Sequence, residues 1–343
     1  MTRKLFILVF GAAISGQVNA SCTLHLVSNS ESVAGVMPLT FPISSFTFTI
    51  DADAPNDSTV PILEKVAQPQ GLAVIYYCTS VDRYGKNVGP VLGQDLGNGL
   101  FATNIDGIAI KPAWNNGAAY GYFNSSGIMP AFEREGVPTE EGFWTYPATS
   151  HFRFELYKIK DTLNLTDTNG ERVLPGGTIA YTWATNNSLA NYAQRLEIGE
   201  IKVISTPSCT FDGPQKVDFG IVTSSNLNNG GIERDLDFNI TCKTDYGHYS
   251  ATAAIFTQTS SADNNYIKVK DSQNQEDRLL IKISDTNGQQ MKVNGSTTEQ
   301  QVNIASGVPA EFKWKAKLEA APAANKPAIG NFSAMAEIIL QIK

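Results

Sequence analysis

Apolar and polar residues alternate along many short segments of this chain, and this alternation limits the fold more than any other feature. It is clear in residues 46–50, 152–156 and 312–318. A period of two residues is typical of a strand with one buried face. Asn-Gly and Asp-Gly pairs accept the positive φ angles of tight hairpins, and seven of them begin at Asn98, Asp106, Asn116, Asn169, Asn229, Asn287 and Asn294. Because no amphipathic helix longer than two turns can be read, the chain is predicted to be an all-β protein.

Residues 1–20 have the pattern of an export signal. Arg3 and Lys4 precede an apolar stretch at 5–14, and Val18-Asn19-Ala20 offers a small-residue cleavage site. The apolar stretch is too short to span a bilayer, so a membrane anchor is the less favoured alternative. The mature chain is expected to begin at Ser21 and to be exported.

Residues 21–343 are long enough for two domains, each with its own core. A boundary is expected at Thr206-Pro207-Ser208, because an apolar strand segment at 196–204 precedes it and Cys209 opens a new segment after it. We therefore expect one domain at 21–205 and a second at 206–343. The short connection with its proline predicts a joint of limited freedom.

Four cysteines form two groups along the chain, Cys22 with Cys78 and Cys209 with Cys242. An even number in an exported protein favours disulfides, although four cysteines allow three pairings. Pairing of nearest neighbours would place one bridge in each domain. No Cys-x-x-Cys is present, which argues against a redox motif or a cysteine-rich zinc site.

The charge balance and the histidines exclude further classes of function. The formal net charge is −7 and there is no run of lysine and arginine, so nucleic acid is not an expected partner. His25, His151 and His248 are scattered without the spacing of metal ligands. Neither a metal nor another cofactor is expected.

An enzyme is not expected either. The chain has no Gly-x-Ser-x-Gly nucleophile elbow, and Gly97-Asn98-Gly99 is not followed by a helix, so it is interpreted as a turn. Glutamates at positions 133, 135, 140 and 141 could supply the carboxylate pair of a glycosidase. Solvated loop charges are the simpler interpretation.

The segment after Cys209 holds too few strands to close an immunoglobulin-like sandwich. Six are expected, at 210–219, 233–242, 251–257, 278–284, 298–304 continuing into 311–318, and 332–342, whereas such a sandwich needs about seven. The chain ends at Lys343, directly after the last of them. We therefore expect an open groove beside an unpaired edge strand, filled by a strand from another polypeptide. The alternative is a self-sufficient sandwich with more strands than this count.

Four short motifs mark the same carboxy-terminal segment. They are Ser208-Cys209-Thr210-Phe211, Phe219-Gly220, Asn239-Ile240-Thr241-Cys242 and, most specific, Gly-x-Phe-x-Ala-x-Ala at 330–336. With them the segment resembles the pilin domains that the chaperone–usher pathway of Gram-negative bacteria assembles, although it lacks the tyrosine that many members carry next to the end. The resemblance implies an incomplete immunoglobulin-like domain that lacks its last strand. It implies as partners a periplasmic chaperone, an outer-membrane usher and the donor strand of the next pilus subunit. The groove for that strand would be formed by Phe332, Ala334, Ala336, Ile338, Leu340 and Ile342.

The amino-terminal domain stands where ordinary pilins carry their own donor segment, so the resemblance implies a subunit at the fibre tip. Cys22, Cys78 after the apolar strand at 74–77, and Gly107-Ile108-Ala109-Ile110 are similar in layout to the lectin-like domains of mannose-, N-acetylglucosamine- and collagen-directed fimbrial adhesins. This implies an immunoglobulin-type sandwich that binds a glycan or a matrix protein, in a tip adhesin exported through the periplasm to the cell surface. The alternatives are a minor or initiator pilus subunit with little receptor affinity and a secreted carbohydrate-active enzyme.

Recognition of a sugar calls for stacking aromatic rings beside hydrogen-bonding side chains on surface loops. Two stretches of residues 21–205 combine these types, and a third, weaker one contains Asn186, Asn187, Asn191 and Tyr192. Each has a plainer interpretation as strand interior or turn. The first stretch offers Trp114, Asn115, Asn116, Tyr120 and Tyr122, and the second offers Glu133, Arg134, Glu135, Trp144 and Tyr146.

Overall fold

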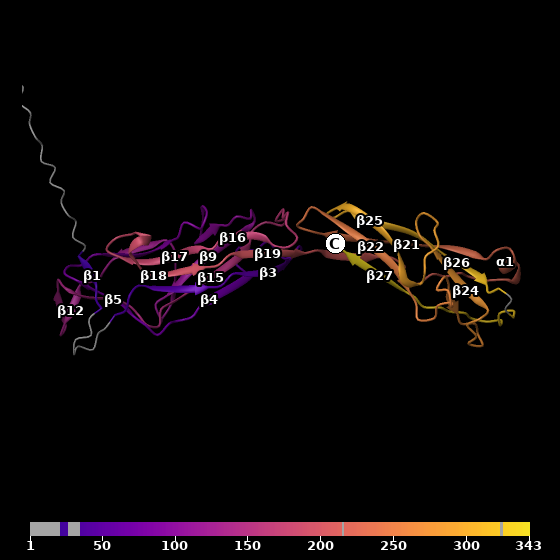
Figure 1. Ribbon diagram of the computed structural model, residues 1–343, viewed down its shortest axis with the longest axis horizontal. Coiled ribbons are helices and arrows are strands. Elements are labelled where there is room, and N and C mark those ends of the chain that lie inside the picture. The colour runs from indigo at the N-terminus through magenta and orange to yellow at the C-terminus, as the bar shows by residue number, and fades with distance from the viewer. Residues whose placement is uncertain (1–20, 27–34, 215, 323–324) are drawn as a thin grey trace, which may run out of the picture.

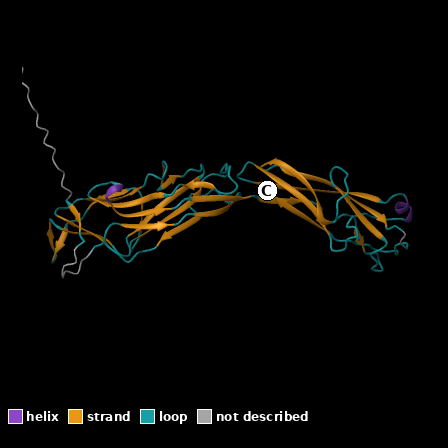
Figure 2. Ribbon diagram, in the orientation of Figure 1, coloured by secondary structure: helices purple, strands orange, loops and turns teal. Residues whose placement is uncertain are grey.

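The computed structural model describes residues 21–26, 35–214, 216–322 and 325–343, so the predicted export signal at 1–20 lies outside the described residues. Two β-rich lobes lie end to end (Figures 1 and 2). Among the described residues the helical elements are the short η1 (Leu189–Asn191) and α1 (Ser224–Asn228). No helix in this part of the chain is long and apolar enough to cross a membrane. The all-β prediction is confirmed.

The amino-terminal lobe is built from two large sheets and three smaller ones. One large sheet has the order β4-β15-β9-β8-β7 with β10 paired to β9, and the other has the order β11-β6-β17-β18-β2. The smaller sheets are β1-β5-β14, β16-β19-β3 and β12-β13. The strands are β1 (Cys22–Leu24), β2 (Leu39–Ile43), β3 (Phe46–Asp51), β4 (Leu63–Ala67), β5 (Val74–Cys78), β6 (Arg83–Val88), β7 (Asp95–Gly97), β8 (Leu100–Ala102), β9 (Ile108–Asn115), β10 (Tyr120–Tyr122), β11 (Ser125–Ile128), β12 (Phe132–Arg134), β13 (Val137–Thr139), β14 (Gly142–Tyr146), β15 (His151–Lys158), β16 (Glu171–Leu174), β17 (Gly177–Ala184), β18 (Tyr192–Ile198) and β19 (Ile201–Thr206).

The core of this lobe lies between the large sheets. The alternating segment at 152–156 forms the middle of β15, and its Phe152, Phe154 and Leu156 are fully buried. The ring of Phe152 packs 5.3 Å from that of Phe41 on the opposite sheet. Burying each of these side chains stabilises the fold by roughly 1.5–3 kcal/mol. A period-2 pattern thus directs three large side chains to one face, where they hold the two sheets together.

The carboxy-terminal lobe is a sandwich of a five-stranded sheet, β20-β21-β26-β24-β23, and a three-stranded sheet, β25-β22-β27. Its strands are β20 (Ser208–Asp212), β21 (Ile232–Lys243), β22 (His248–Phe256), β23 (Ile267–Val269), β24 (Leu279–Ser284), β25 (Asn294–Ala305), β26 (Pro309–Ala320) and β27 (Glu337–Ile342). On β26, Phe312 and Trp314 are buried against Phe238, with ring centroids 4.9 and 4.8 Å from that of Phe238. The buried Trp314 Nε1 donates a hydrogen bond of 2.7 Å to Glu299.

The expected set of six strands is wrong in four places, and the described part of the lobe holds eight strands. The first strand ends at Asp212 rather than at Phe219. The three-residue strand β23 is too short to show a periodic pattern. Strands β25 and β26 are not one element, because they belong to different sheets. The last strand begins at Glu337 rather than at Phe332, since the backbone from 332 to 336 runs as loop with one isolated bridge from Ser333 to Lys270.

Both disulfides join neighbouring strands, and the nearest-neighbour pairing is confirmed. Cys22 faces Cys78 across β1 and β5, and Cys209 faces Cys242 across β20 and β21. They close loops with sequence separations of 56 and 33 residues. In the chain-entropy model each such loop contributes about 4 kcal/mol by restricting the unfolded chain.

The two lobes meet at a short joint, because only Pro207 separates β19 from β20. The loop after β21 reaches back across this joint. There the buried Asp245 accepts hydrogen bonds from the backbone N–H of Leu163 at 2.9 Å and from the Ser205 hydroxyl at 2.6 Å. The next residue, Tyr246, accepts a hydrogen bond from the backbone N–H of Ser205 at 3.1 Å. Side chains as well as the covalent chain therefore connect the lobes.

Candidate functional site

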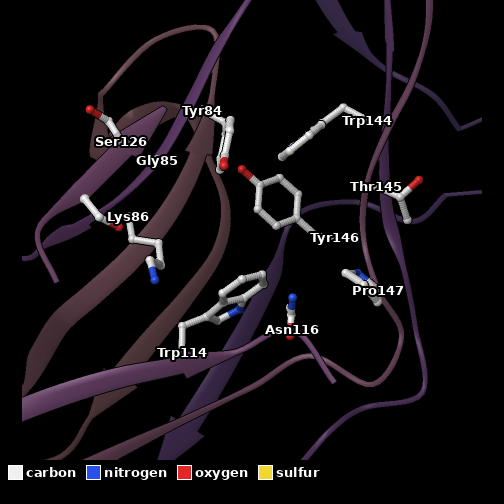
Figure 3. A pocket seen from close by; sticks show the side chains of 11 residues that line it. Tyr84, Gly85, Lys86, Trp114, Asn116, Ser126, Trp144, Thr145, Tyr146 and Pro147 are labelled. Atoms are coloured by element: carbon white, nitrogen blue, oxygen red, sulfur yellow. The ribbon is translucent and has the colours of Figure 1, made fainter. Parts of the chain in front are cut away.

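A pocket of about 420 Å³ opens between β6, β11, β9 and β14 of the amino-terminal lobe (Figure 3). Strands β6 and β11 pair so that Ser125 lies opposite Lys86. Strand β9 supplies Trp114 from the adjacent sheet, and β14 supplies residues from a third. The lining residues are Tyr84, Gly85, Lys86, Trp114, Asn116, Ser125, Ser126, Trp144, Thr145, Tyr146 and Pro147.

Aromatic rings form most of the pocket wall. Trp144 and Tyr146 are two residues apart on β14, so both project from the same face of the strand. The ring of Tyr84 lies 4.4 Å from that of Trp144, and the ring of Trp114 lies 5.9 Å from that of Tyr146. The four rings therefore form one continuous apolar surface (Figure 3).

Two hydrogen bonds hold this surface in place. Trp114 Nε1 donates to Gln194 Oε1 at 2.8 Å, and the Tyr146 hydroxyl donates to the carbonyl of Trp183 at 2.6 Å. Burial raises the pKa of Tyr146 above its ordinary value, so its hydroxyl stays a donor to higher pH than that of an exposed tyrosine. Rings locked in this way are pre-organised for a ligand, because little side-chain entropy is lost on binding.

Lys86 is the charged side chain of the pocket. It is half-buried on β6, and its Nζ lies 5.9 Å from the ring centroids of both Trp114 and Phe123. Burial lowers the pKa of Lys86, because the charged ammonium is less well solvated there. Gly121 of β10 faces the ammonium, and a Cβ at that position would overlap with Nζ.

The structure brings four of the sequence-predicted residues into this pocket. Trp114 and Asn116 come from the first predicted stretch, and Trp144 and Tyr146 come from the second. The two stretches, considered separately in the sequence, thus line one cavity. That this cavity is a binding site stays a prediction.

The other predicted residues lie outside the pocket lining. The Tyr120 hydroxyl is 2.9 Å from His151 Nε2, and the Tyr122 ring lies under Lys111 at 4.1 Å. Asn115 accepts a hydrogen bond from the backbone N–H of Gly117 and so shapes a turn. Exposed positions on the hairpin of β12 and β13 are occupied by Glu133, Arg134 and Glu135.

Sequence reasoning missed the whole β6–β11 side of the pocket. Tyr84, Lys86, Ser125 and Ser126 reach the site because these strands pair. The two strands are far apart in sequence and contain no motif. The one usable signal was the alternation of Tyr84 and Lys86, which places them on the same face of a strand.

A second cavity, of about 360 Å³, lies in the carboxy-terminal lobe beside β27. Strand β27 pairs only with β22 among the described strands, so its other edge is unpaired. Ile338, Leu340 and Ile342 are half-buried and alternate with exposed residues. The cavity is lined by Pro214, Lys216, Val217, Phe219, Leu236, Ile255, Ile267, Ile281, Ile283, Ala316, Phe332, Ser333, Ala334, Met335, Ala336 and Ile338.

Four of the six predicted groove residues line this second cavity. They are Phe332, Ala334, Ala336 and Ile338. The other two, Leu340 and Ile342, pack against the same hydrophobic core without lining the cavity. That this edge is a groove for a foreign strand stays a prediction.

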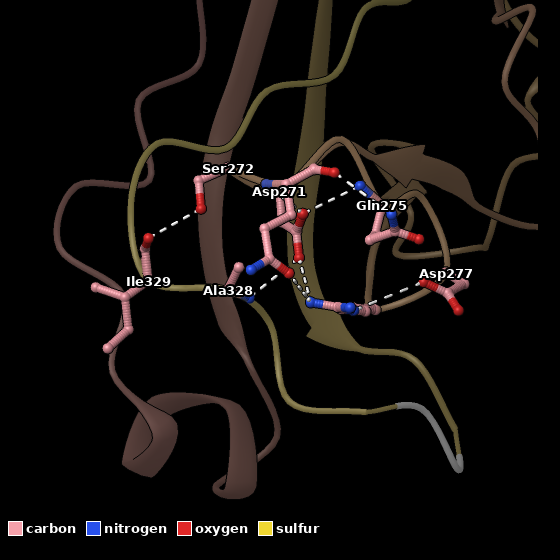
Figure 4. Close-up of polar contacts among 8 residues, drawn as sticks. Asp271, Ser272, Gln275, Asp277, Ala328 and Ile329 are labelled. Carbon is pink, nitrogen blue, oxygen red and sulfur yellow. Dashed lines mark hydrogen bonds and ion pairs between the residues drawn. The ribbon is translucent and has the colours of Figure 1, made fainter.

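The loop before β27 is fastened by one buried carboxylate (Figure 4). Asp271 accepts hydrogen bonds of 3.0 Å from the backbone N–H of Ala328 and from the guanidinium of Arg278. The Ser272 hydroxyl donates to the carbonyl of Ile329 at 2.9 Å. The hydrogen bond from Ala328 is the main cause that lowers the pKa of Asp271. These contacts fix the segment that borders the cavity.

Metal-binding geometry is not found in the part of the chain that the structure describes. No three side chains of histidine, cysteine, aspartate or glutamate lie close enough there to hold an ion.

Comparison with known proteins gives one family and several distant structural likenesses. Residues 199–343 match the family model described as Fimbrial protein, and no match was found among curated proteins. The chain is similar to the receptor binding domain of the plasmid-borne adhesin MrkD1P of Klebsiella pneumoniae, with 17% identity over 55% of this chain and 98% of that chain and a TM-score of 0.36.

It is also similar to the CsuC–CsuE chaperone–tip adhesion subunit complex of Acinetobacter baumannii, with 9% identity over 89% of this chain and 99% of that chain and a TM-score of 0.41. The CupB6 tip adhesin from Pseudomonas aeruginosa matches with 10% identity over 94% of each chain and a TM-score of 0.34. At this distance these likenesses assign no function. The family match covers the carboxy-terminal lobe: residues 199–343 of this chain are similar to the fimbrial protein family.

Proposed function

We propose that this protein is a fimbrial tip adhesin whose amino-terminal lobe binds a surface glycan in the pocket of Trp114, Trp144, Tyr84 and Tyr146. The observation that carries the proposal is the continuous aromatic wall of a cavity large enough for a sugar ring. Aromatic faces pack against the C–H groups of a sugar, while Asn116, Ser125 and Ser126 offer hydrogen bonds to its hydroxyls. Such a protein binds its ligand and catalyses no reaction on it.

The position of the pocket supports a role at the tip of a fibre. Lys158, at the end of β15, donates to the carbonyl of Ala52 at 2.9 Å, and Ala52 bonds to Thr206 beside the joint. At the start of the same strand, His151 pairs with Asn115, next to the pocket. Eight residues of strand span about 25 Å. The pocket therefore lies toward the end of the lobe that faces away from the carboxy-terminal lobe.

A glycan array tests this proposal directly. The mature full-length chain, held in complex with a strand-donating chaperone, should bind a defined set of glycans. Trp114→Ala and Trp144→Ala should abolish that binding, whereas Phe143→Ala should retain it, because Phe143 lies on the opposite face of β14. The proposal fails if the folded protein binds no glycan, or if both tryptophan variants bind as the parent chain does.

The same proposal requires that the carboxy-terminal lobe accepts a strand along the free edge of β27. In this account a periplasmic chaperone supplies the strand first, and the next pilus subunit replaces it after passage through an outer-membrane usher. Support comes from the unpaired edge and from the apolar cavity beside it. Added strands gain affinity from main-chain hydrogen bonds and specificity from side-chain pockets at alternate positions.

Two neighbouring residues provide a matched test of strand acceptance. Ile338 is half-buried in the cavity wall, whereas Ile339 is 47% exposed on the opposite face of β27. Ile338→Lys should prevent capture by the chaperone, and Ile339→Lys should be captured normally in co-purification. Equal capture of the two variants would contradict strand acceptance at this groove.

A further inference from the structure

We propose that the glycan bound in the amino-terminal pocket carries a carboxylate, and that this group pairs with Nζ of Lys86. The inference rests on the proposed glycan-binding function of the pocket and names the class of sugar. Lys86 is the sole charged side chain among the described residues that line the cavity, and no aspartate or glutamate accompanies it.

Within the described part of the chain, no acidic side chain pairs with the ammonium of Lys86. None of the ion pairs or side-chain hydrogen bonds among residues 21–26, 35–214, 216–322 and 325–343 involves its Nζ, which faces the rings of Trp114 and Phe123 instead. Other lysines of the protein pair with acids, as Lys315 does with Glu233 at 2.8 Å. A half-buried, unpaired ammonium is costly, and the lowered pKa of Lys86 reflects that cost.

Local packing keeps this ammonium in the pocket. Gly121 lies opposite Trp114 in the β9–β10 ladder, and its lack of a side chain leaves the space that Nζ occupies. The φ angle of Gly121 is not in the positive region that favours glycine. The position therefore needs a glycine for room, not for backbone conformation. The glycine at position 121 and the packing around it therefore leave room for the ammonium of Lys86.

A carboxylated sugar satisfies both features of the site. Its ring would stack on the aromatic wall, and its carboxylate would accept a charge-assisted hydrogen bond from Lys86. A neutral sugar that filled the same pocket would offer the ammonium only uncharged hydroxyl acceptors, which compensate a half-buried charge less well than a carboxylate does. Uronic acids and sialic acids share this carboxylate, so the chemistry of the pocket admits either.

The test compares carboxylated glycans with the same glycans after reduction of the carboxyl to a primary alcohol. The full-length mature chain in its chaperone complex should bind at least one uronic or sialic acid glycan, and reduction should weaken binding about ten-fold or more. Lys86→Met should bind both forms equally and weakly. Lys65→Met is the matched control, because Lys65 also lies over a ring, that of Phe46, but outside the pocket.

Gly121→Ala provides a second variant, which keeps the charge of Lys86 but displaces its ammonium. It should lose the preference for the carboxylated form while its thermal unfolding temperature stays near that of the parent chain, since the flexible end of Lys86 can yield. This inference would be overturned if the protein bound neutral glycans and if reduction of the carboxyl did not weaken binding. The proposed function would still stand if Trp114→Ala abolished that binding. Absence of binding to every glycan in both forms would overturn both.

Discussion

The hydroxyl of Ser205, in the last strand of the amino-terminal lobe, donates a hydrogen bond of 2.6 Å to the buried carboxylate of Asp245 in the carboxy-terminal lobe. The other oxygen of this carboxylate accepts from the backbone N–H of Leu163, and the Asp245 carbonyl accepts from that of Leu165 at 2.8 Å. One aspartate therefore satisfies groups from two separate segments of the amino-terminal lobe. The lobes are held in a fixed relation by polar contacts as well as by the short connection at Pro207.

Removal of this carboxylate should loosen the joint. Asp245→Ala leaves the donors of Leu163 and Ser205 without their acceptor, at a cost of about 1–3 kcal/mol for each donor that stays buried. We expect faster proteolysis near Pro207 and a broader distribution of lobe distances in small-angle scattering. Asp245→Asn is the matched control, because its amide oxygen still accepts one hydrogen bond. Unchanged proteolysis and scattering in Asp245→Ala would show that the joint does not depend on Asp245.

The segment before β27 should detach in acid. Hydrogen bonding, first from the Ala328 amide, lowers the pKa of Asp271 in the folded protein. A lowered folded-state pKa means stabilisation that is present above the ordinary aspartate value, about 4, and lost as pH falls through the lowered value. Protection factors of the amides at residues 328–333, which correct for the pH dependence of intrinsic exchange, should therefore decrease as pH falls below about 4. In Asp271→Asn these protection factors should be low at neutral pH and should depend little on pH.

Binding of a carboxylated glycan should weaken in alkali. Burial lowers the pKa of Lys86 from 10.5, so its ammonium is lost at lower pH than that of an exposed lysine. Affinity should fall as pH rises through this lowered value, while binding of a carboxyl-reduced glycan should stay level. The other titratable groups that line the pocket are the hydroxyls of Tyr84 and Tyr146, and burial raises the pKa of Tyr146. Lys86→Met should show no such fall.

Substitution of Trp114 by phenylalanine should separate what its ring contributes to glycan binding from what its hydrogen bond contributes to stability. Trp114→Phe retains an aromatic face but leaves the fully buried Gln194 without the 2.8 Å bond to its Oε1. We expect a loss of about 1–3 kcal/mol in the free energy of unfolding, measured by chemical denaturation, with glycan binding weakened but present. Equal stability of the two proteins would show that this hydrogen bond does not stabilise the wall.

Local patterns in the sequence were enough to predict the type of fold. The alternation at 152–156 and 312–318 corresponds to buried faces of β15 and β26. The Asn98-Gly99 pair turns between β7 and β8, with φ angles of 53° and 77°. These features depend only on residues that are close in sequence, so the sequence pattern predicts the strand or turn without knowledge of the rest of the fold.

The site needed information that no local pattern contains. Trp114 and Trp144 line the same pocket only because β9 and β14 belong to sheets that pack together, and Lys86 joins them through the pairing of β6 with β11. Conversely, the charged run Glu133-Arg134-Glu135 has the chemistry of a binding loop but lies on a separate hairpin. Side-chain type suggested candidates, and non-local strand order selected among them.

The proposed function requires that the carboxy-terminal lobe takes a strand from another chain along the free edge of β27. Hydrogen exchange of the mature full-length protein, measured with and without a peptide of alternating apolar residues, tests it most directly. We expect the amides of Glu337–Ile342 that point away from β22 to exchange rapidly alone and to become strongly protected when the peptide is added. Strong protection of those amides without any added strand, unchanged by the peptide, would contradict the claim.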